Sequence, residues 1–179
     1  MVKDPEESSV TLTELMLPSH SNFSGKIHGG YILNLMDQIA FAAASKFSGK
    51  YCVTASINKV DFKNPVSVGE LLSLKARVNY VGRTSMTVGI RVTSENIQTG
   101  EIKHCNSSYF VMVAKDEDGK NAMVPELRLT SVEDVRRFVR AKSKLENTRA
   151  RVREFDAASF DAQAHLDSLK DHRVVLDLE

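Results

Sequence analysis

Residues 31–47 read YILNLMDQIAFAAASKF, and this stretch decides the fold of the chain. Leu, Met and Ala dominate it, and all three favour a helix. The polar residues of its first half, Asn34, Asp37 and Gln38, are spaced so that they share one stripe of that helix. Because the remainder is apolar nearly all round, we predict a helix that other structure surrounds.

Segments typical of β-strands stand on both sides of this helix. Upstream, 10–17 predicts a first strand or an edge segment, and 18–30, rich in Pro, Ser, Asn, Gly and His, predicts a long loop. Downstream, turn residues separate four strand-like segments, at 51–62, 68–81, 86–92 and 102–113. Strands at such short spacing favour an antiparallel meander.

Alternating apolar residues indicate which face of each strand packs against the helix. The residues expected to share a face are Leu72, Leu74, Ala76, Val78 and Tyr80 in one strand, Met86, Val88, Ile90 and Val92 in the next, and Cys105, Tyr109, Val111 and Val113 in the last. We therefore predict an α+β fold in which a curved antiparallel sheet wraps round one apolar helix.

The organisation of the chain follows from these segments. We expect a flexible leader at 1–9, the folded domain at 10–130 and a charged C-terminal helical extension at 131–179. Ser131, followed by acidic residues in the first turn, predicts the start of that extension. Its apolar positions are sparse, so we expect one narrow stripe to pack on the domain or on a partner subunit, with fraying of the helix in solution as the alternative.

Composition excludes several classes of protein. The 179 residues carry 24 Lys and Arg against 23 Asp and Glu, so we expect no nucleic-acid groove. No run of 18 apolar residues is present, and the first ten residues lack the apolar core of a signal peptide, so we expect no membrane span. Two cysteines cannot make a disulfide framework, so we expect a reducing, cytoplasmic setting.

Two features of the helix bear on chemistry. Asp37 has two interpretations. It either lies on an exposed stripe or bonds a neighbouring loop, with no catalytic role, or it lines a site as a general base or nucleophile. Gly29 and Gly30 are either a plain loop-to-helix turn or the free N–H groups of an oxyanion hole. Because Asp37 follows about two turns later, the two features suggest a site shared between two protomers.

Five segments, in the same order along the chain, resemble those of a known family. They are NFSGKIHGG at 22–30 with Asp37 seven residues on, DFKNPV with VGE at 61–70, YVGRTSM at 80–86, YFV at 109–111, and DGK with VP at 118–125. Over residues 10–130 the chain resembles the hotdog-fold acyl-CoA thioesterases. It is most similar to their oligomeric, cytosolic long- and medium-chain acyl-CoA hydrolases.

This resemblance implies a fold, an activity and an assembly. In the implied fold the long helix is central and the curved sheet wraps round it. The implied reaction is hydrolysis of fatty acyl-CoA, with Asp37 as base or nucleophile, Asn22 holding the substrate or the water, and the Gly29 and Gly30 amides facing the thioester carbonyl. His28 is structural or touches the thioester. The family's Asn and Asp come from opposite protomers of a dimer, and such dimers often form trimers.

Further residues follow from the same resemblance. Some relatives carry a hydroxyl residue after the helix that orients water, and that place falls near Ala55, so a hydroxyl assistant is not expected here. The residues expected to bind the coenzyme A phosphates are Arg83, Thr84, Ser85, Lys59 and Lys63. An arginine fork at a hairpin suits phosphate, although a solvated turn arginine is the alternative. Coenzyme A is part of the substrate, so no cofactor is expected.

Other chemistries are not supported by the sequence. The histidines and cysteines show no metal-ligand spacing, and neither a phosphate-binding glycine motif nor a G-x-S-x-G elbow is present. Cys52 and Cys105 are expected in the core. Two rivals to hydrolysis remain open, namely an acyl-CoA-binding protein without catalysis and an acyl-thioester dehydratase in which His28 would act with Asp37.

Overall fold

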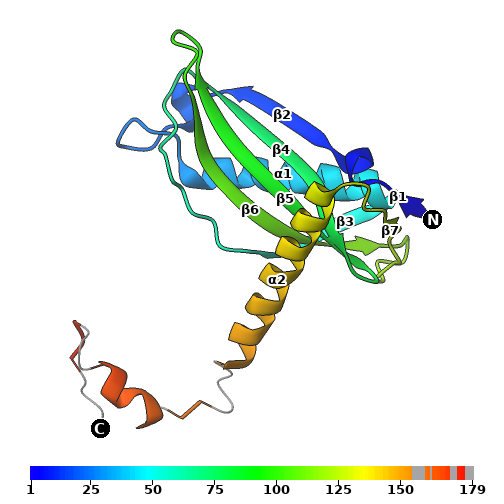
Figure 1. Cartoon of the computed structure of the whole chain (residues 1–179). Coiled ribbons are helices and arrows are strands. Elements are labelled where there is room, and N and C mark those ends of the chain that lie inside the picture. The colour runs from blue at the N-terminus through cyan, green and yellow to red at the C-terminus, as the bar shows by residue number, and fades with distance from the viewer. Residues whose placement is uncertain (155–159, 162, 170–172, 176–179) are drawn as a thin grey trace. The chain divides into compact units, whose positions relative to one another are not determined.

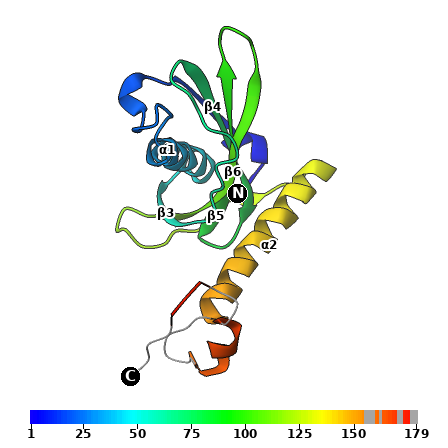
Figure 2. The same ribbon diagram turned by 90° about the vertical axis from the view of Figure 1, so that its left-hand side faces the viewer.

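A computed structural model describes residues 1–154, 160–161, 163–169 and 173–175, and in it a five-stranded antiparallel sheet curls around helix α1 (Gly29–Ser48) (Figures 1 and 2). The strands lie in the order β2-β4-β5-β6-β3, with bounds β2 Val10–Leu15, β3 Tyr51–Ile57, β4 Glu70–Val81, β5 Ser85–Asn96 and β6 Ile102–Lys115. The prediction of an α+β hotdog fold is confirmed.

Helix α1 begins two residues earlier than the sequence predicted, because His28 caps it. The Nδ1 atom of His28 accepts a 3.0 Å hydrogen bond from the Gly30 amide. At the other end, Gly49 adopts the left-handed conformation at φ 67° and its N–H donates to the Ser45 carbonyl at 2.8 Å. The long loop before the helix therefore ends in a defined cap.

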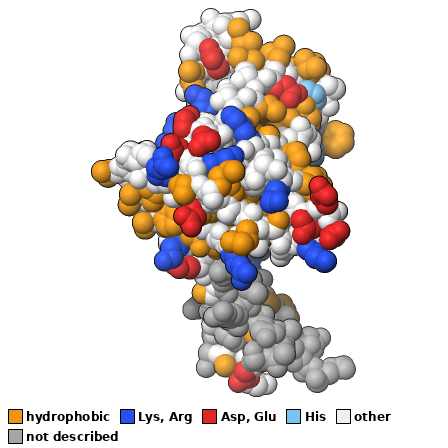
Figure 3. Space-filling model, turned by 90° about the vertical axis from the view of Figure 1, so that its right-hand side faces the viewer, with side chains coloured by type: hydrophobic (Ala, Val, Ile, Leu, Met, Phe, Trp, Pro, Cys, Tyr) orange, Lys and Arg blue, Asp and Glu red, His pale blue; other side chains and the backbone are white. Residues whose placement is uncertain are grey.

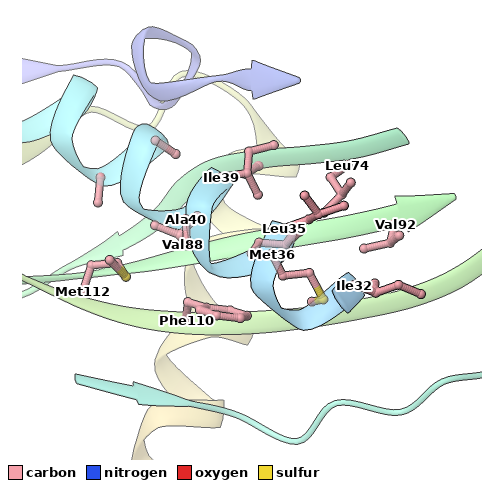
Figure 4. Close-up of a cluster of buried hydrophobic side chains, with 14 of the residues drawn as sticks. Ile32, Leu35, Met36, Ile39, Ala40, Leu74, Val88, Val92, Phe110 and Met112 are labelled. Atoms are coloured by element: carbon pink, nitrogen blue, oxygen red, sulfur yellow. The ribbon is translucent and has the colours of Figure 1, made fainter. Parts of the chain in front are cut away.

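The core lies between α1 and the concave face of the sheet (Figure 4). The helix contributes Ile32, Leu35, Met36, Ile39 and Ala40, and the strands contribute Leu74, Val88, Val92, Phe110 and Met112. All of these side chains are buried, which stabilises the fold by about 1.5–3 kcal/mol for each large one. The prediction that other structure surrounds the apolar helix is thus confirmed.

Two irregularities in the sheet correct the predicted strand faces. The β4–β5 register shifts between Val78 and Tyr80, so Tyr80 leaves the inner face and contacts Phe138 outside it. A second shift, between Val92 and Thr93, changes the alternation in β6. The inner residues of β6 are accordingly Cys105, Phe110, Met112 and Ala114, not Tyr109, Val111 and Val113.

The first nine residues, predicted as a flexible leader, contain two short elements. Strand β1 (Val2–Lys3) pairs in parallel with β7 (Glu126–Leu127), and the 3-10 helix η1 (Pro5–Ser8) follows. Ser8 is fully buried, and its hydroxyl accepts a 2.8 Å hydrogen bond from the Val78 amide. Backbone pairing and a buried hydroxyl hold this segment against β4.

The described residues form two compact units, Met1–Leu145 and Glu146–Glu179. Helix α2 (Val132–Glu154) therefore begins in the first unit, where Phe138 contacts Tyr80 at 5.0 Å between ring centroids and Ala141 is fully buried. The second unit includes the 3-10 helix η3 (Gln163–Leu169). The parts of the predicted extension at 155–159, 162, 170–172 and 176–179 lie outside the described residues.

Positive and negative side chains are mixed on the surface, in keeping with the nearly balanced composition. Lys and Arg side chains are interspersed with Asp and Glu on the face in Figure 3. Among the described helices, none combines the length and the hydropathy that crossing a membrane requires. In the same part of the chain, no three His, Cys, Asp or Glu side chains gather as metal ligands would.

Candidate active site

The candidate active site starts at Asp37, which lies on the exposed stripe of α1. The Thr54 hydroxyl of β3 donates a 2.6 Å hydrogen bond to Oδ1 of Asp37. The sequence interpretation did not anticipate this hydrogen bond. Counting along the chain gave Ala55 as the corresponding position, whereas the structure places the hydroxyl of the preceding residue, Thr54, against Asp37, just before the β3–β6 register shifts.

An open groove of about 550 Å³ lies beside this pair. Its walls are Asp37, Gln38, Phe41, Tyr51, Cys52, Val53, Thr54 and Met112. Phe41 and Tyr51 meet edge to face with ring centroids 5.7 Å apart, and both remain exposed. The groove therefore combines a carboxylate and a hydroxyl with an apolar wall, along the outer edge of the sheet.

The N-terminus of α1 forms the second part of the site. Its Gly30 amide is engaged by His28, so Gly29 carries the N–H group that points out of the helix end. A Cβ atom on Gly29 would lie only 3.3 Å from the Phe62 ring, which shows how closely that ring packs here. Glycine at this position keeps the amide accessible beside Phe62.

Asn22 organises the loop that leads to this helix end. Its Oδ1 atom accepts hydrogen bonds from the Ser24 amide at 3.0 Å, the Ser24 hydroxyl at 2.7 Å and the Lys26 amide at 3.2 Å. The side-chain oxygen thus shapes the loop, and the amide nitrogen is the group that can donate to a ligand.

A tyrosine that sequence reasoning missed anchors the same loop. The Tyr31 hydroxyl donates to Glu14 of β2, and the Tyr31 ring stacks on His20 with centroids 4.0 Å apart. The His28 amide also donates to the His20 carbonyl at 2.9 Å. The hydrogen bond to Glu14, together with burial, raises the pKa of Tyr31 above 10.0. Only the pairing of β2 with β4 brings these residues together.

The segment between β3 and β4 holds the other side of the loop. The Ile27 amide donates to the Val66 carbonyl at 2.9 Å, and Lys26 Nζ donates to the Ser67 hydroxyl at 3.1 Å. Glu70 accepts from the Ser67 amide and from Lys103. Burial opposes ionisation of Glu70, but its hydrogen bonds to Lys103, Ser67 and Ser94 outweigh burial and lower its pKa.

The residues expected to bind coenzyme A separate into two groups. Arg83, Thr84 and Ser85 form the β4–β5 turn, where Ser85 pairs with Val113 and Val113 pairs with Val53 of β3. This turn thus lies in the row of the sheet next to Thr54. Lys59 and Lys63 instead follow the far end of β3, where Lys59 pairs with Asp61 at 3.1 Å. A single chain does not bring the two groups together.

Comparison with known proteins agrees with this geometry. Residues 24–101 match the thioesterase superfamily model. The chain is 40% identical over 141 residues to protein VdlD of Helicobacter pylori, covering 79% of this chain and 80% of VdlD. It is 32% identical over 130 residues to the uncharacterized acyl-CoA thioester hydrolase YkhA of Bacillus subtilis, covering 73% and 76%. The chain belongs to the thioesterase superfamily, in its hotdog-fold branch of acyl-CoA thioester hydrolases.

Solved structures show the same likeness. A hexameric acyl-CoA thioesterase superposes with a TM-score of 0.81 at 40% identity, covering 84% of this chain and 97% of that one. An acyl-CoA hydrolase of Staphylococcus aureus, solved with butyryl coenzyme A and coenzyme A, gives 0.80 at 27% identity, covering 94% and 99%. Its solved variants replace an Asn, an Asp or a Thr by alanine, at positions 15 and 17 residues apart. Asn22, Asp37 and Thr54 have the same spacing.

Proposed function

We propose that the protein hydrolyses fatty acyl-CoA to a free fatty acid and coenzyme A. The observation that carries this proposal is the Thr54 hydrogen bond to Asp37 at the wall of an open groove. The spacing of Asn22, Asp37 and Thr54, shared with the S. aureus hydrolase, supports it.

The chemistry assigned to these residues is attack of water on the thioester carbonyl. The water oxygen bonds to the carbonyl carbon while Asp37 takes a proton from that water, and Thr54 holds the Asp37 carboxylate in place. The negative charge on the carbonyl oxygen meets the Gly29 amide and the positive end of the α1 dipole. The carbon–sulfur bond then breaks, and coenzyme A leaves as a thiolate that needs little acid assistance.

The proposed hydrolysis needs groups from two protomers. Gly29 and Asp37 are about two helical turns apart, roughly 12 Å along the axis at about 1.5 Å per residue, which is too far for one carbonyl. Strand β3 is one of the two edge strands of the sheet, and Tyr51 and Ile57 are exposed there. Two copies joined along β3 would place Asn22 and Gly29 of one protomer opposite Asp37 of the other.

Assembly and ligand binding follow from the same proposal. The hexameric thioesterases among the structural neighbours support a trimer of such dimers. Coenzyme A phosphates would meet Arg83, Thr84 and Ser85, with Lys59 and Lys63 at the other end of β3. We assign no metal or redox cofactor to the reaction. The two cysteines are free and buried, which is compatible with the proposed cytoplasmic setting.

Thiol release from acyl-CoAs of C2 to C18 tests the function. The wild type should release coenzyme A, and Asp37→Asn should lower kcat/KM by about a hundredfold or more. Asp118→Asn, at an exposed carboxylate in the turn after β6, is the matched control and should be unchanged. A wild type that binds coenzyme A without releasing thiol would replace the proposal with a sensor role. The dehydratase alternative is disfavoured because His28 caps α1 about two turns from Asp37.

A further inference from the structure

Phe23 is an aromatic residue that the fold of a single chain leaves fully exposed to solvent. It directly follows Asn22 in the loop before α1, and this loop projects beyond the N-terminal end of the helix (Figure 1). Aromatic side chains are enriched where two protein surfaces meet. The position of Phe23 beside a residue of the candidate site therefore raises the question of what covers its ring in the assembled protein.

The backbone that carries Phe23 is held in one conformation by hydrogen bonds. The Gly25 amide donates to the Asn22 carbonyl at 3.0 Å, and the Asn22 amide donates to the Lys26 carbonyl at 2.7 Å. Gly25 closes this turn at φ 75°, a conformation that glycine adopts without strain. The ring is therefore presented outward by a tight turn whose place at the end of α1 is fixed.

The groove at Asp37 contains two further exposed aromatic side chains. Phe41 lies one helical turn after Asp37, about 6 Å along the axis and on the same face of α1. Tyr51 meets it edge to face from β3, with the ring centroids 5.7 Å apart. Phe41 is 39% exposed and Tyr51 is 64% exposed, so the pair bounds the groove and still offers apolar surface to another ring.

The dimer proposed above brings these aromatic residues together. Two copies joined along their β3 edges by a two-fold axis carry their α1 helices antiparallel, with Gly29 of one copy opposite Asp37 of the other. Each step toward the C-terminus in one helix then matches a step toward the N-terminus in its partner. Phe41, four residues after Asp37, falls opposite Gly25, four residues before Gly29. The turn that carries Phe23 therefore reaches the aromatic end of the groove.

We infer, on the basis of the proposed hydrolysis, that Phe23 of each copy closes the acyl groove of the other copy and limits the length of the acyl chain. Its ring packs on Phe41 and Tyr51, one helical turn from the Asp37 carboxylate. The apolar wall of the groove, which also includes Met112, takes the hydrocarbon of the substrate. A short acyl chain ends before the three rings, whereas a long one must displace them, so the site prefers short-chain acyl-CoA.

Thiol release from butyryl-CoA and dodecanoyl-CoA by the full-length protein tests the limit on chain length. We expect the wild type to prefer butyryl-CoA, and Phe23→Ala to raise the ratio of kcat/KM for dodecanoyl-CoA over butyryl-CoA at least tenfold. Phe23→Leu keeps an apolar side chain and should change the ratio less. Ile97→Ala, at an exposed isoleucine in the turn after β5, is the matched control and should leave the ratio unchanged.

Chemical cross-linking tests the contact without any turnover. The double variant Phe23→Cys/Tyr51→Cys, treated with a short bismaleimide, should give a covalent dimer on a denaturing gel. Each single variant, treated in the same way, should remain a monomer on that gel, because one reactive thiol per chain then has no partner nearby. The native Cys52 and Cys105 are buried and should not contribute.

The outcomes separate this inference from the proposed function. A wild type that hydrolyses acyl-CoA, together with an unchanged ratio in Phe23→Ala or no covalent dimer in the double variant, overturns the inference and leaves the function standing. A wild type that prefers dodecanoyl-CoA also overturns it. Equal loss of both activities in Phe23→Ala, with a fall in assembly mass by light scattering, shows that Phe23 only joins the copies. A wild type that releases thiol from no acyl-CoA overturns the function and the limit together.

Discussion

Thr54 on the edge strand donates a 2.6 Å hydrogen bond to Asp37 in the middle of α1. The bond joins the outermost strand of the sheet to the helix that the sheet encloses. It fixes the direction in which the Asp37 carboxylate presents its second oxygen to the groove. A carboxylate held by one hydroxyl loses rotational freedom, which is what a positioned base requires.

Removal of this hydroxyl should slow the reaction without unfolding the protein. Thr54→Val keeps the shape and loses the donor, so we expect kcat/KM for acyl-CoA to fall about tenfold. Thr54→Ser should retain most of the activity because it keeps the hydroxyl. Thr11→Val on β2 is the control for an exposed threonine far from the groove. Equal activity of Thr54→Val and wild type would show that Asp37 needs no partner.

Gly29 should tolerate a methyl group structurally but not catalytically. The Phe62 ring, 3.3 Å from the added Cβ atom, is half exposed and can shift, so Gly29→Ala should change Tm by less than about 4 °C. The methyl group stands beside the amide assigned to the oxyanion, so kcat/KM should fall about tenfold. Phe62→Ala alone should retain more activity than Gly29→Ala. If Phe62→Ala retained less activity than Gly29→Ala, the loss of activity in Gly29→Ala would be assigned to displacement of the Phe62 ring.

Tyr31 should matter to stability and to the loop at 22–28. Tyr31→Phe removes the hydrogen bond to Glu14 and should lower the free energy of unfolding by about 1–2 kcal/mol. Tyr51→Phe, at an exposed tyrosine, is the control. The raised pKa of Tyr31 means that its contribution is present below pH 10 and is lost as pH rises above it. Ultraviolet titration should show a late-ionising tyrosine in wild type that is lost in Tyr31→Phe.

Asp134 should make the docking of α2 sensitive to acid. Burial opposes its ionisation, but hydrogen bonds from Ser131 and Arg77 outweigh burial and lower its pKa from 3.8 to about 2. Because the folded pKa is depressed, its contribution is present above about pH 4 and is lost as pH falls toward 2. The amount lost is on the order of 2 kcal/mol.

Urea unfolding followed by circular dichroism at pH 6 and pH 2.5 measures this contribution. Asp134→Asn should be less stable than wild type at pH 6, and the difference should narrow at pH 2.5. Asp118→Asn, at a carboxylate that is 77% exposed, should follow the wild type at both values. A constant difference between Asp134→Asn and wild type across this range would contradict the assigned ionisation.

The sequence by itself determined the elements and the composition of the core. A long apolar helix with one polar stripe and strands with period-two alternation are local patterns, and hydrophobic burial leaves few ways to combine them. Asp37, Gly29 and Gly30 were candidates for the same reason, since a helix start and a carboxylate within an apolar helix are visible in a linear sequence, whereas Asn22 was a candidate through the family resemblance. His28 was visible as a loop residue, although its role as the helix cap was not.

Tertiary structure alone decided which side chains meet. Thr54 reaches Asp37 because β3 packs beside α1, a contact between separate elements that a linear pattern does not contain. Tyr31 of α1 meets Glu14 through packing of the helix against β2, and Lys75 faces Arg91 through the pairing of β4 with β5. The order of 1–9 likewise depends on pairing of β1 with β7. Local propensity fixes where an element begins and ends, whereas long-range pairing fixes which functional groups become neighbours.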